Sequence, residues 1–332
     1  MNRQHIGILL GVIVSVIFLV LAFRGLRPEA LFASLANVNA LLVLLATVVY
    51  FCAVTLISWR WQFLLTPVRR IPLFRLIQLV CIGYMGNNIY PLRAGEALRI
   101  FLLKRDEGVP VFRSTTVTIV ERIFDGIVML TFILVGVTTT DIQSDVVQTV
   151  AQVTTPIFAF GLIVFFTFAL FPKQALKFVE RVTVILPMRL QTIVNHLAAE
   201  VLSGLAALQN IGQLLGAIFA SYASWMVEAL IYWLVMMAFG FDLPYTAALL
   251  VVGTVNLAGL IPASPGQIGV YEFFASSAMV GFGITQDRAL SYAIVVHIVI
   301  WLPVTLVGFA FLVRRGLGWG ALATSGTLKE SS

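Results

Sequence analysis

Charge is what this sequence has least of. Only 11% of its 332 residues are Asp, Glu, Lys or Arg, whereas soluble domains carry roughly 25%. Hydrophobic residues make up 60% of the chain, and several apolar runs reach the ~20 residues needed to cross a bilayer. The sequence therefore predicts a polytopic integral membrane protein with no soluble domain.

Residues typical of metal, redox and nucleotide sites are also scarce. The three histidines have no metal-ligand spacing. Cys52 and Cys81 lie apart in apolar stretches, where they form neither a disulfide framework nor a metal motif. No phosphate-binding loop, nucleophile elbow or dinucleotide fingerprint occurs in the chain. We expect no catalytic residues, no metal, no cofactor and no ATP drive. The net charge of +6 sits in short clusters between apolar runs, which argues against nucleic acid.

Hydropathy marks the segments that are long enough to span a membrane. The predicted full-length transmembrane helices cover residues 6–23, 40–59, 114–138, 151–171, 211–239 and 288–312.

Two further apolar regions are interrupted by helix breakers. Region 73–105 is broken by the NNIYP segment at 87–91 and by Gly95. Region 245–284 is broken by the PASPG segment at 262–266 and by Gly269. Each region is long enough for two half-helices, which predicts a re-entrant helical hairpin. The expected fold is an all-α integral membrane protein with six full transmembrane helices and two re-entrant hairpins.

Basic residues set the expected orientation. Clusters at 60–75 and 104–113 place both flanks of the first hairpin in the cytoplasm, and the second hairpin then enters from the outer side. This topology puts 15 of the 21 Lys and Arg on the cytoplasmic side. An amphipathic stretch over about 172–205 lies on that side, where its basic cluster contacts anionic headgroups. We expect a multi-pass protein of the cell (inner) membrane, with both termini in the cytoplasm and residues 313–332 as a cytoplasmic tail.

The same order of elements occurs twice. Residues 6–138 and 151–312 each read as span, span, hairpin, span, in opposite orientations. The hairpin breaks share the pattern P-x-x-x-G-[E/Q], at 91–96 and 262–267. Inverted repeats whose broken helices meet near the midplane are typical of transporters. We therefore expect a single membrane domain over 1–332, built from two inverted halves.

Charged residues inside a membrane are costly and usually functional. They concentrate here at the hairpins and in two spans. Glu121 and Asp125 are four residues apart and share one helix face. The candidate substrate-binding residues are Asn87, Arg93, Gly95, Glu96, Arg99, Glu121, Arg122, Asp125, Glu228, Ser264, Gly266, Gly269 and Glu272.

The second break also resembles a helix start. Ser264 is expected as the N-cap, Pro265 at the first helical position and Gln267 at the third. A half-helix that begins inside the membrane turns unpaired N–H groups toward an anion such as phosphate. Gly266 and Gly269 would let a ligand approach this backbone closely, and Gly95 would do the same in the first hairpin.

Each candidate has a structural alternative. Arg93 and Glu96 pair with one another, or with Glu121 and Asp125, to satisfy buried charge. Glu228 is either a proton or headgroup site or a hydrogen-bonded interior residue. His297 fits a packed interior imidazole, and the partner of Arg122 is open.

Three ordered motifs resemble the lysylphosphatidylglycerol synthase transmembrane family. They are N-x-x-x-P-x-R-x-G-E-x-x-R at 87–99, E-R-x-x-D at 121–125 and P-x-x-P-G-x-x-G-x-x-E at 262–272. Arg60-Trp61 followed by Leu64-Leu65 also looks like that family's second span. One departure is Gln267, where relatives usually carry a second glycine; a larger side chain there is expected to narrow or re-tune the outer site.

The resemblance implies a function in lipid transport. In multiple peptide resistance factors, this domain is a flippase for aminoacylated phosphatidylglycerol and is fused to a cytoplasmic synthase. Lysyl transfer is not implied here, because the chain ends at Ser332 without that synthase. The leading hypothesis is a flippase-like translocator in which Arg93 and the half-helix N-termini hold a phosphate.

Two other classes of function remain open. One is an intramembrane enzyme that uses Glu96, Glu121 and Asp125 as acid/base groups. The other is a non-catalytic lipid-binding scaffold for a lipid synthase or glycosyltransferase. The expected partners are membrane lipids: anionic or aminoacylated phospholipid, or polyprenyl-linked or hopanoid lipid.

Overall fold

A computed structural model describes most of the chain. The described residues are 3–24, 28–66, 68–90, 94–142, 171–188 and 211–315, with scattered positions between 144 and 199. Within these residues all regular structure is helical and no β-strand occurs. The all-α prediction is confirmed for this part of the chain. Arg93, most of the predicted span 151–171 and residues 316–332 of the tail lie outside the described residues.

The long helices lie where hydropathy predicts them. Three are long and apolar enough to cross a membrane: α3, α10 over residues 212–238, and α13. The short helix α2, which follows the first predicted span, was not predicted. The bounds are α1 Arg3–Phe23, α2 Pro28–Ala36, α3 Ala40–Leu65, α6 Val111–Thr139, α8 Pro172–Thr183, α10 Ile211–Ala238 and α13 Gln286–Arg314.

Both interrupted regions form a helix, a break and a second helix. The first contains α4 Leu73–Ile89 and α5 Ala94–Glu107. Proline restricts the residue before it to extended backbone, and Tyr90, which precedes Pro91, has φ −103° and ψ 147°. The second contains α11 Tyr245–Ala258, the short 3₁₀ helix η3 Pro265–Gln267 and α12 Val270–Gly281. How these pairs sit in a membrane, and whether the halves form an inverted repeat, stay predictions.

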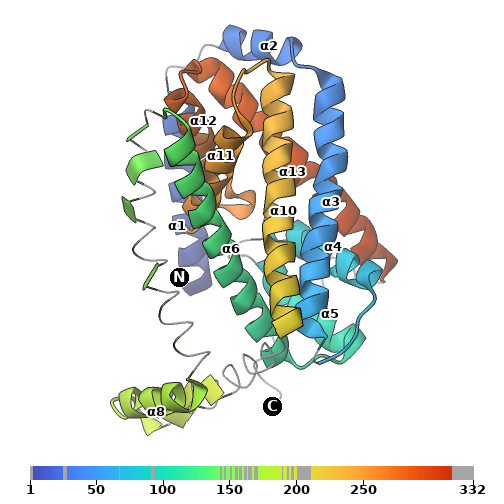
Figure 1. Cartoon of the computed structure of the whole chain (residues 1–332), viewed down its shortest axis with the longest axis vertical. Helices are drawn as coiled ribbons and strands as arrows, with labels where there is room; N and C mark the ends of the chain where they lie inside the picture. The colour runs from blue at the N-terminus through green and yellow to red at the C-terminus, as the bar shows by residue number, and fades with distance from the viewer. Residues whose placement is uncertain are drawn as a thin grey trace.

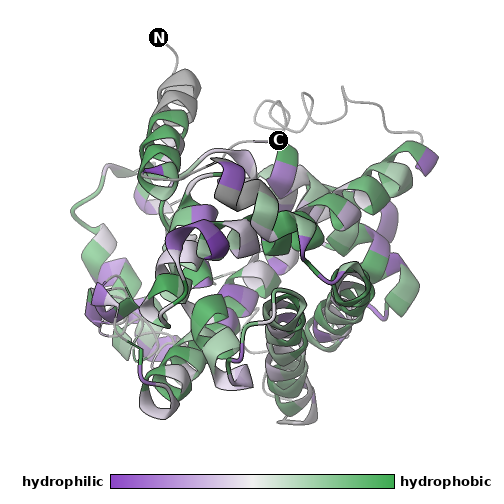
Figure 2. Cartoon of the chain, turned by 90° about the horizontal axis from the view of Figure 1, so that it is seen from above, coloured by the Kyte–Doolittle hydropathy of each residue, from purple (hydrophilic) through white to green (hydrophobic). Residues whose placement is uncertain are grey.

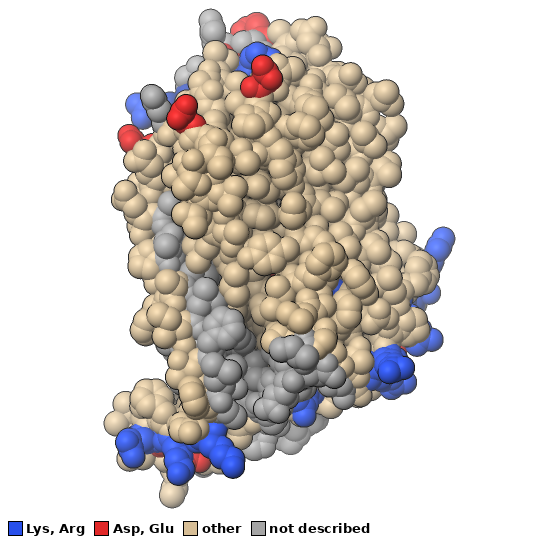
Figure 3. Space-filling view, in the orientation of Figure 1, with Lys and Arg blue, Asp and Glu red and all other residues tan. Residues whose placement is uncertain are grey.

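The helices form an upright bundle in which α3 and α10 run side by side (Figure 1). Seen from above, apolar residues dominate the outer helices, and hydrophilic segments occur near the centre (Figure 2). The face shown in Figure 3 has a broad uncharged middle. Lys and Arg gather at its lower end, which includes α8, while most of its Asp and Glu lie at the upper end. This division is the one expected of a protein that spans a membrane.

Gly95 allows α4 and α5 to pack closely. A Cβ atom at this position would collide with the backbone of Gly83 and Asn87. Gly95 is buried and is absent from the lining of the cavity described below. The expectation that Gly95 opens the backbone to a ligand is wrong, because the neighbouring helix already occupies that space.

The second break is held open by left-handed backbone. Gly266, Gln267 and Gly269 have φ of 69°, 57° and 90°. The predicted helix start at Ser264 is correct in part. The 3₁₀ helix η3 begins at Pro265 with Ser264 at the N-cap position, but the Ser264 side chain makes no cap hydrogen bond and the α-helix begins only at Val270. Glu272 takes over the capping role. Its Oε2 accepts a hydrogen bond of 2.6 Å from the backbone N–H of Gly269.

The shared break pattern also differs in local structure. Gly95 and Glu96 lie in the first turn of α5, whereas Gly266 and Gln267 lie in η3, before α12 begins. The residues that match in sequence therefore differ in backbone conformation.

We expect Gly95→Ala to destabilise the protein. The added methyl group meets backbone atoms, so α4 and α5 must separate, and overpacking of this kind costs about 1–3 kcal/mol. The measurement is the thermal unfolding temperature of purified protein in detergent. Ala97→Ser, at an exposed position on α5, is the matched control. A Gly95→Ala protein as stable as wild type would contradict the close packing.

A second expectation concerns the left-handed backbone at Gln267. Asn and Gly tolerate positive φ, whereas a β-branched residue does not. Gln267→Val should therefore unfold with a free energy about 1–2 kcal/mol lower than Gln267→Asn. Gln267→Gly should be at least as stable as Gln267→Val. Equal stability of the Asn and Val variants would argue against a left-handed residue at this position.

Candidate functional site

A cavity of about 470 Å³ lies between the two breaks. Its walls include the end of α4 and the whole 259–267 segment, so residues from both interrupted regions face one space. Helices α3, α6, α10 and α13 complete the walls. The residues used below that line the cavity are Tyr50, Tyr84, Asn87, Asn88, Glu96, Arg122, Asp125, Trp225, Glu228, Tyr232, Asn256, Ser264, Gly266, Gln267, Tyr271, His297 and Trp301.

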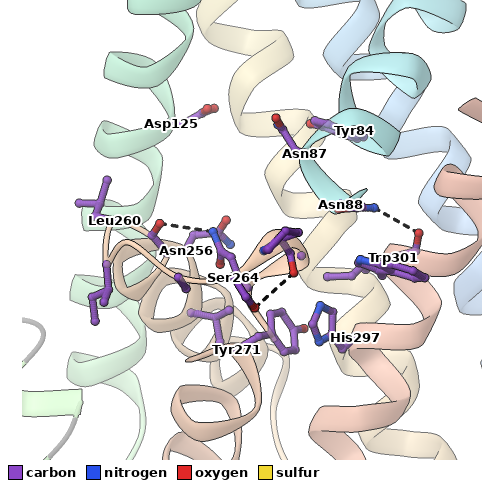
Figure 4. Close-up of a pocket in the computed structure, with 18 of the residues that line it drawn as sticks. Tyr84, Asn87, Asn88, Asp125, Asn256, Leu260, Ser264, Tyr271, His297 and Trp301 are labelled. Atoms are coloured by element: carbon purple, nitrogen blue, oxygen red, sulfur yellow. Dashed lines mark hydrogen bonds between the residues drawn. The ribbon is translucent and has the colours of Figure 1, made fainter. Parts of the chain in front are cut away.

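One side of the cavity carries its charged groups. Figure 4 shows Asp125 of α6 on the same side as Tyr84 and Asn87 of α4. Asp125 Oδ1 accepts a hydrogen bond of 2.7 Å from the indole of Trp225. The amide oxygen Oδ1 of Asn87 is buried and has no hydrogen-bond partner within the described part of the chain, which is unusual because buried polar atoms are nearly always paired.

The other side consists mainly of neutral hydrogen-bonding groups around the second break (Figure 4). Asn256 Nδ2 donates to Val252 O at 2.9 Å, and Gln267 Nε2 donates to Gly259 O at 3.3 Å. The indole N–H of Trp301 is buried and finds no hydrogen-bond acceptor among the described residues. A Cβ at Gly266 would lie 2.6 Å from that indole nitrogen. The absence of a side chain at Gly266 therefore makes room for the Trp301 ring. This side offers amide groups and an aromatic ring rather than charge.

Asn88 ties the first break to α13. Its Nδ2 donates to Trp301 O at 3.3 Å and to Thr305 Oγ1 at 2.8 Å. Trp301 precedes Pro303, which lies within α13. The two interrupted regions are thus fixed to the same part of α13.

Behind the charged side lies a buried ion cluster. Arg60 of α3 donates to Glu121 at 2.5 Å and to Asp125 at 2.6 Å. The other oxygen of Glu121 accepts from Arg99 of α5 at 2.7 Å. The Arg99 guanidinium also stacks over the Trp61 ring, 3.9 Å from its centroid. Arg60 is 1% exposed and Glu121 is 0% exposed, so these charges are shielded from any ligand in the cavity.

Arg60 is the main residue that the charge pattern misassigned. Its sequence position beside a basic cluster suggested a cytoplasmic cation that sets topology. The structure instead buries it between two carboxylates of α6. The Arg60-Trp61 pair in the family resemblance was the available signal, because a paired arginine next to a buried tryptophan is typical of an interior position.

Arg122 lies at the edge of the same cluster. Its nitrogens are 3.9 Å from Glu96, 3.6 Å from Glu121 and 3.5 Å from Asp125. Its side chain is 40% exposed. Arg122 therefore has long contacts and faces the cavity, in contrast to the short contacts of the buried arginines.

Glu272 and His297 form a second polar pair. His297 Nδ1 lies 2.6 Å from Glu272 Oε1, and the His297 ring stacks on Tyr271 with centroids 4.2 Å apart. The interpretation of His297 as a packed interior imidazole is correct in part, since it is buried but also lines the cavity. Glu272 and Gly269 do not line it. A Cβ at Gly269 would collide with the backbone of α1 at Ser15, so this glycine serves packing.

Glu228 belongs neither to the ion cluster around Arg60 nor to the Glu272–His297 pair. It lies in the middle of α10 and lines the cavity. Among the described residues no hydrogen bond or ion pair reaches its carboxylate, and both alternatives for Glu228, a proton or headgroup site and a hydrogen-bonded interior residue, stay predictions.

The structure thus gathers part of the candidate set into one place. Around the cavity lie Asn87, Glu96, Arg122, Asp125, Glu228, Ser264 and Gly266. Arg99 and Glu121 lie behind its wall, and Gly95, Gly269 and Glu272 support the helices. The aromatic and amide residues Tyr84, Tyr232, Asn256 and Trp301 were missed, because single polar or aromatic residues in an apolar run give no sequence signal.

Comparison with known proteins identifies the family. Residues 8–308 match the Lysylphosphatidylglycerol synthase TM region. The chain is similar to a UPF0104 membrane protein of Methanothermobacter thermautotrophicus, with 24% identity over 90% of both chains. A UPF0104 membrane protein of Pyrococcus horikoshii is 20% identical over 95% of this chain and 98% of its own.

One relative carries an enzyme name. Glycosyltransferase AglD of Haloferax volcanii is 25% identical over 89% of this chain, which corresponds to 52% of AglD. The chain thus matches about half of that protein. Because the family match covers nearly the whole sequence, the chain belongs to the Lysylphosphatidylglycerol synthase TM region family.

Proposed function

We propose that this protein translocates a lipid across the membrane. The polar headgroup passes through the cavity between the two breaks, while the acyl tails stay in the bilayer. The observation that carries the proposal is the cavity itself, which is lined by both breaks and holds charged, amide and aromatic side chains inside an apolar bundle. Non-helical backbone at membrane depth is tolerated only where protein or a wet cavity covers it.

The proposal includes a membrane arrangement. Six helices span the bilayer and the two interrupted regions are re-entrant, entering from opposite sides. The gathering of Lys and Arg at one end of the bundle supports this, with that end in the cytoplasm (Figure 3).

The family and its relatives support a role that involves membrane lipids. The family is named for a lipid synthase region, and AglD is named a glycosyltransferase. An acceptor for such an enzyme in a membrane is a lipid-linked molecule. The headgroup is therefore either a modified phospholipid or a lipid-linked sugar, and both carry the phosphate and hydrogen-bonding groups that the cavity walls match.

Intramembrane enzyme chemistry has weaker support. Both carboxylate oxygens of Glu121 accept hydrogen bonds from arginines, and the residue is 0% exposed. A general acid or base must come within hydrogen-bond reach of its substrate. Glu121 therefore positions helices rather than reacting.

The proposal is tested by blocking the cavity. In a background with Cys52→Ala and Cys81→Ala, Ser264→Cys places a thiol in the cavity wall. We expect modification of this thiol by a bulky, polar methanethiosulfonate reagent to slow translocation about tenfold or more, since pocket residues touch most of a bound ligand. The measurement is the loss of fluorescent phospholipid from one leaflet of proteoliposomes.

Asp141→Cys provides the control. Asp141 is exposed beyond the end of α6 and outside the cavity, where a polar reagent reaches it, so its modification should leave the rate unchanged. Fluorescent aminoacylated phospholipid and a polyprenyl-linked sugar are tested in parallel to identify the headgroup. Folded, unmodified protein that moves none of these lipids would contradict the proposal, as would equal inhibition by the two labelled positions.

Variants of the buried ion cluster should affect the stability of the protein. We expect Arg60→Met to lower the free energy of unfolding by about 3–5 kcal/mol, because it leaves two buried carboxylates without their main partner. Arg60→Lys should also destabilise, since a single ammonium cannot reproduce the guanidinium fork. Thermal unfolding in detergent measures both. Arg70→Lys, at an exposed position, is the control, and wild-type stability of Arg60→Met would refute this role.

A further inference from the structure

We infer that Glu228 binds the proton that couples lipid translocation to the proton gradient. The inference rests on the proposed translocation and extends it to an energy source. It stands on the position of Glu228 in the cavity and on the charges around it.

The charges of the ion cluster compensate one another. Among the residues that the structure describes, three arginines face three carboxylates there: Arg60, Arg99 and Arg122 against Glu96, Glu121 and Asp125. Every one of these side chains is within 4.0 Å of an opposite charge. None of these arginines makes an ion pair with Glu228. An ionised Glu228 would therefore add one uncompensated negative charge to the membrane interior.

An uncompensated charge at this depth is unfavourable, and its cost depends on water. A carboxylate inside a transmembrane segment is destabilised unless it is paired or hydrated. When the cavity is open to water, the carboxylate can be hydrated and can release its proton. When the cavity is closed, the neutral acid is favoured. Because Glu228 lines the cavity, its protonation state must follow the opening and closing of that space.

Tyrosine hydroxyl groups share the cavity with Glu228. Tyr50 of α3, Tyr84 of α4 and Tyr232, one turn further along α10, all line it and interact electrostatically with the carboxylate. The Tyr232 hydroxyl accepts a hydrogen bond of 2.8 Å from Tyr271, whose ring stacks on His297. The cavity that holds Glu228 therefore also holds hydroxyl groups that connect α10 with α12.

Titratable groups on several helices interact electrostatically with Glu228. They are Tyr50 on α3, Tyr84 on α4, Asp125 on α6, Tyr232 on α10 and Tyr271 on α12. Asp125 is already held by Arg60 and Trp225. The same cavity is also lined by Glu96, Arg122 and His297.

The coupled step is balanced. A proton from water on one side of the membrane binds the Glu228 carboxylate, the cavity changes its accessible side, and the proton leaves to water on the other side. One lipid headgroup moves with each cycle. For one proton per lipid, a gradient of one pH unit can change the ratio of lipid between leaflets up to about tenfold.

The experiment uses full-length protein in liposomes of phosphatidylglycerol and phosphatidylcholine with a fluorescent reporter lipid. The leaflet ratio is measured at equal pH on both sides and then across a gradient of one pH unit. Wild type should translocate the reporter at equal pH and shift the leaflet ratio up to about tenfold with the gradient. Glu228→Gln, which cannot release a proton, should show no shift with the gradient, whatever its rate at equal pH.

An infrared difference spectrum provides a second readout that does not depend on transport. Titration of wild-type protein should change the carbonyl band of a neutral carboxylic acid, and Glu228→Gln should lose that band. Glu180→Gln, on the exposed surface of α8, is the matched control and should behave like wild type in both assays. Thermal unfolding verifies that each variant is folded.

The outcomes separate the two proposals. Translocation by wild type at equal pH with no response to the gradient overturns the coupling and leaves the translocator intact. A carbonyl band that persists in Glu228→Gln also overturns the coupling. If folded wild type moves no lipid at equal pH, both proposals fail. A gradient response and a carbonyl band that are both lost only in Glu228→Gln support the coupling.

Discussion

The bundle depends on neutralising one guanidinium in its interior. Arg60 is 1% exposed, and an unpaired arginine at that depth would be strongly unfavourable. Its two carboxylate partners both come from α6, and one of them also holds Arg99 of α5. This requirement fixes α3 and α5 against α6. Ser221 of α10 accepts a further hydrogen bond from Arg60 at 3.3 Å, so four helices meet at the cluster.

The same constraint shapes the cavity beside it. Asp125 faces the cluster through Oδ1 and lines the cavity as well. The helix breaks must also be covered, because lipid offers no partner to free backbone groups. The structure covers them with each other and with α1 and α13: Ser264 N–H donates to Ser15 Oγ at 2.9 Å, and Asn88 reaches Trp301. Asn88 and Ser264, which form these hydrogen bonds at the breaks, also line the cavity.

Hydropathy predicted the elements well and the contacts poorly. The ends of α6, α10 and α13 lie close to the predicted spans, because lipid-facing helices need continuous apolar runs whose ends are readable. Pro91 likewise placed the end of α4. The predicted span 40–59 ends too early, because α3 continues to Leu65 and includes Arg60. Arg60 was misread because hydropathy ranks an arginine by its neighbours in sequence, whereas its partners are 61 and 65 residues away.

The second break shows a different limit. Its Ser-Pro sequence predicted a helix start at 264, and a helix does begin at Pro265, but it is a 3₁₀ turn, and the positive φ of Gly266, Gln267 and Gly269 delays the α-helix to Val270. Local sequence does not reveal whether such a conformation is supported by tertiary contacts. Gln267 is the one of these three positions that is not a glycine, so the left-handed backbone is strained there.

The lengths of the ion pairs indicate how the site can respond to a ligand. The contacts of Arg60 and Arg99 are 2.5–2.7 Å and are fully buried, whereas those of Arg122 are 3.5–3.9 Å at a side chain that is 40% exposed. Charge-assisted hydrogen bonds are strong at about 2.7–2.9 Å and weaken with distance. Under the proposed function, an anionic headgroup would compete for Arg122 at little cost to the bundle, while the buried pairs keep the helices in place. The proposal thus assigns stability and binding to different arginines of one cluster.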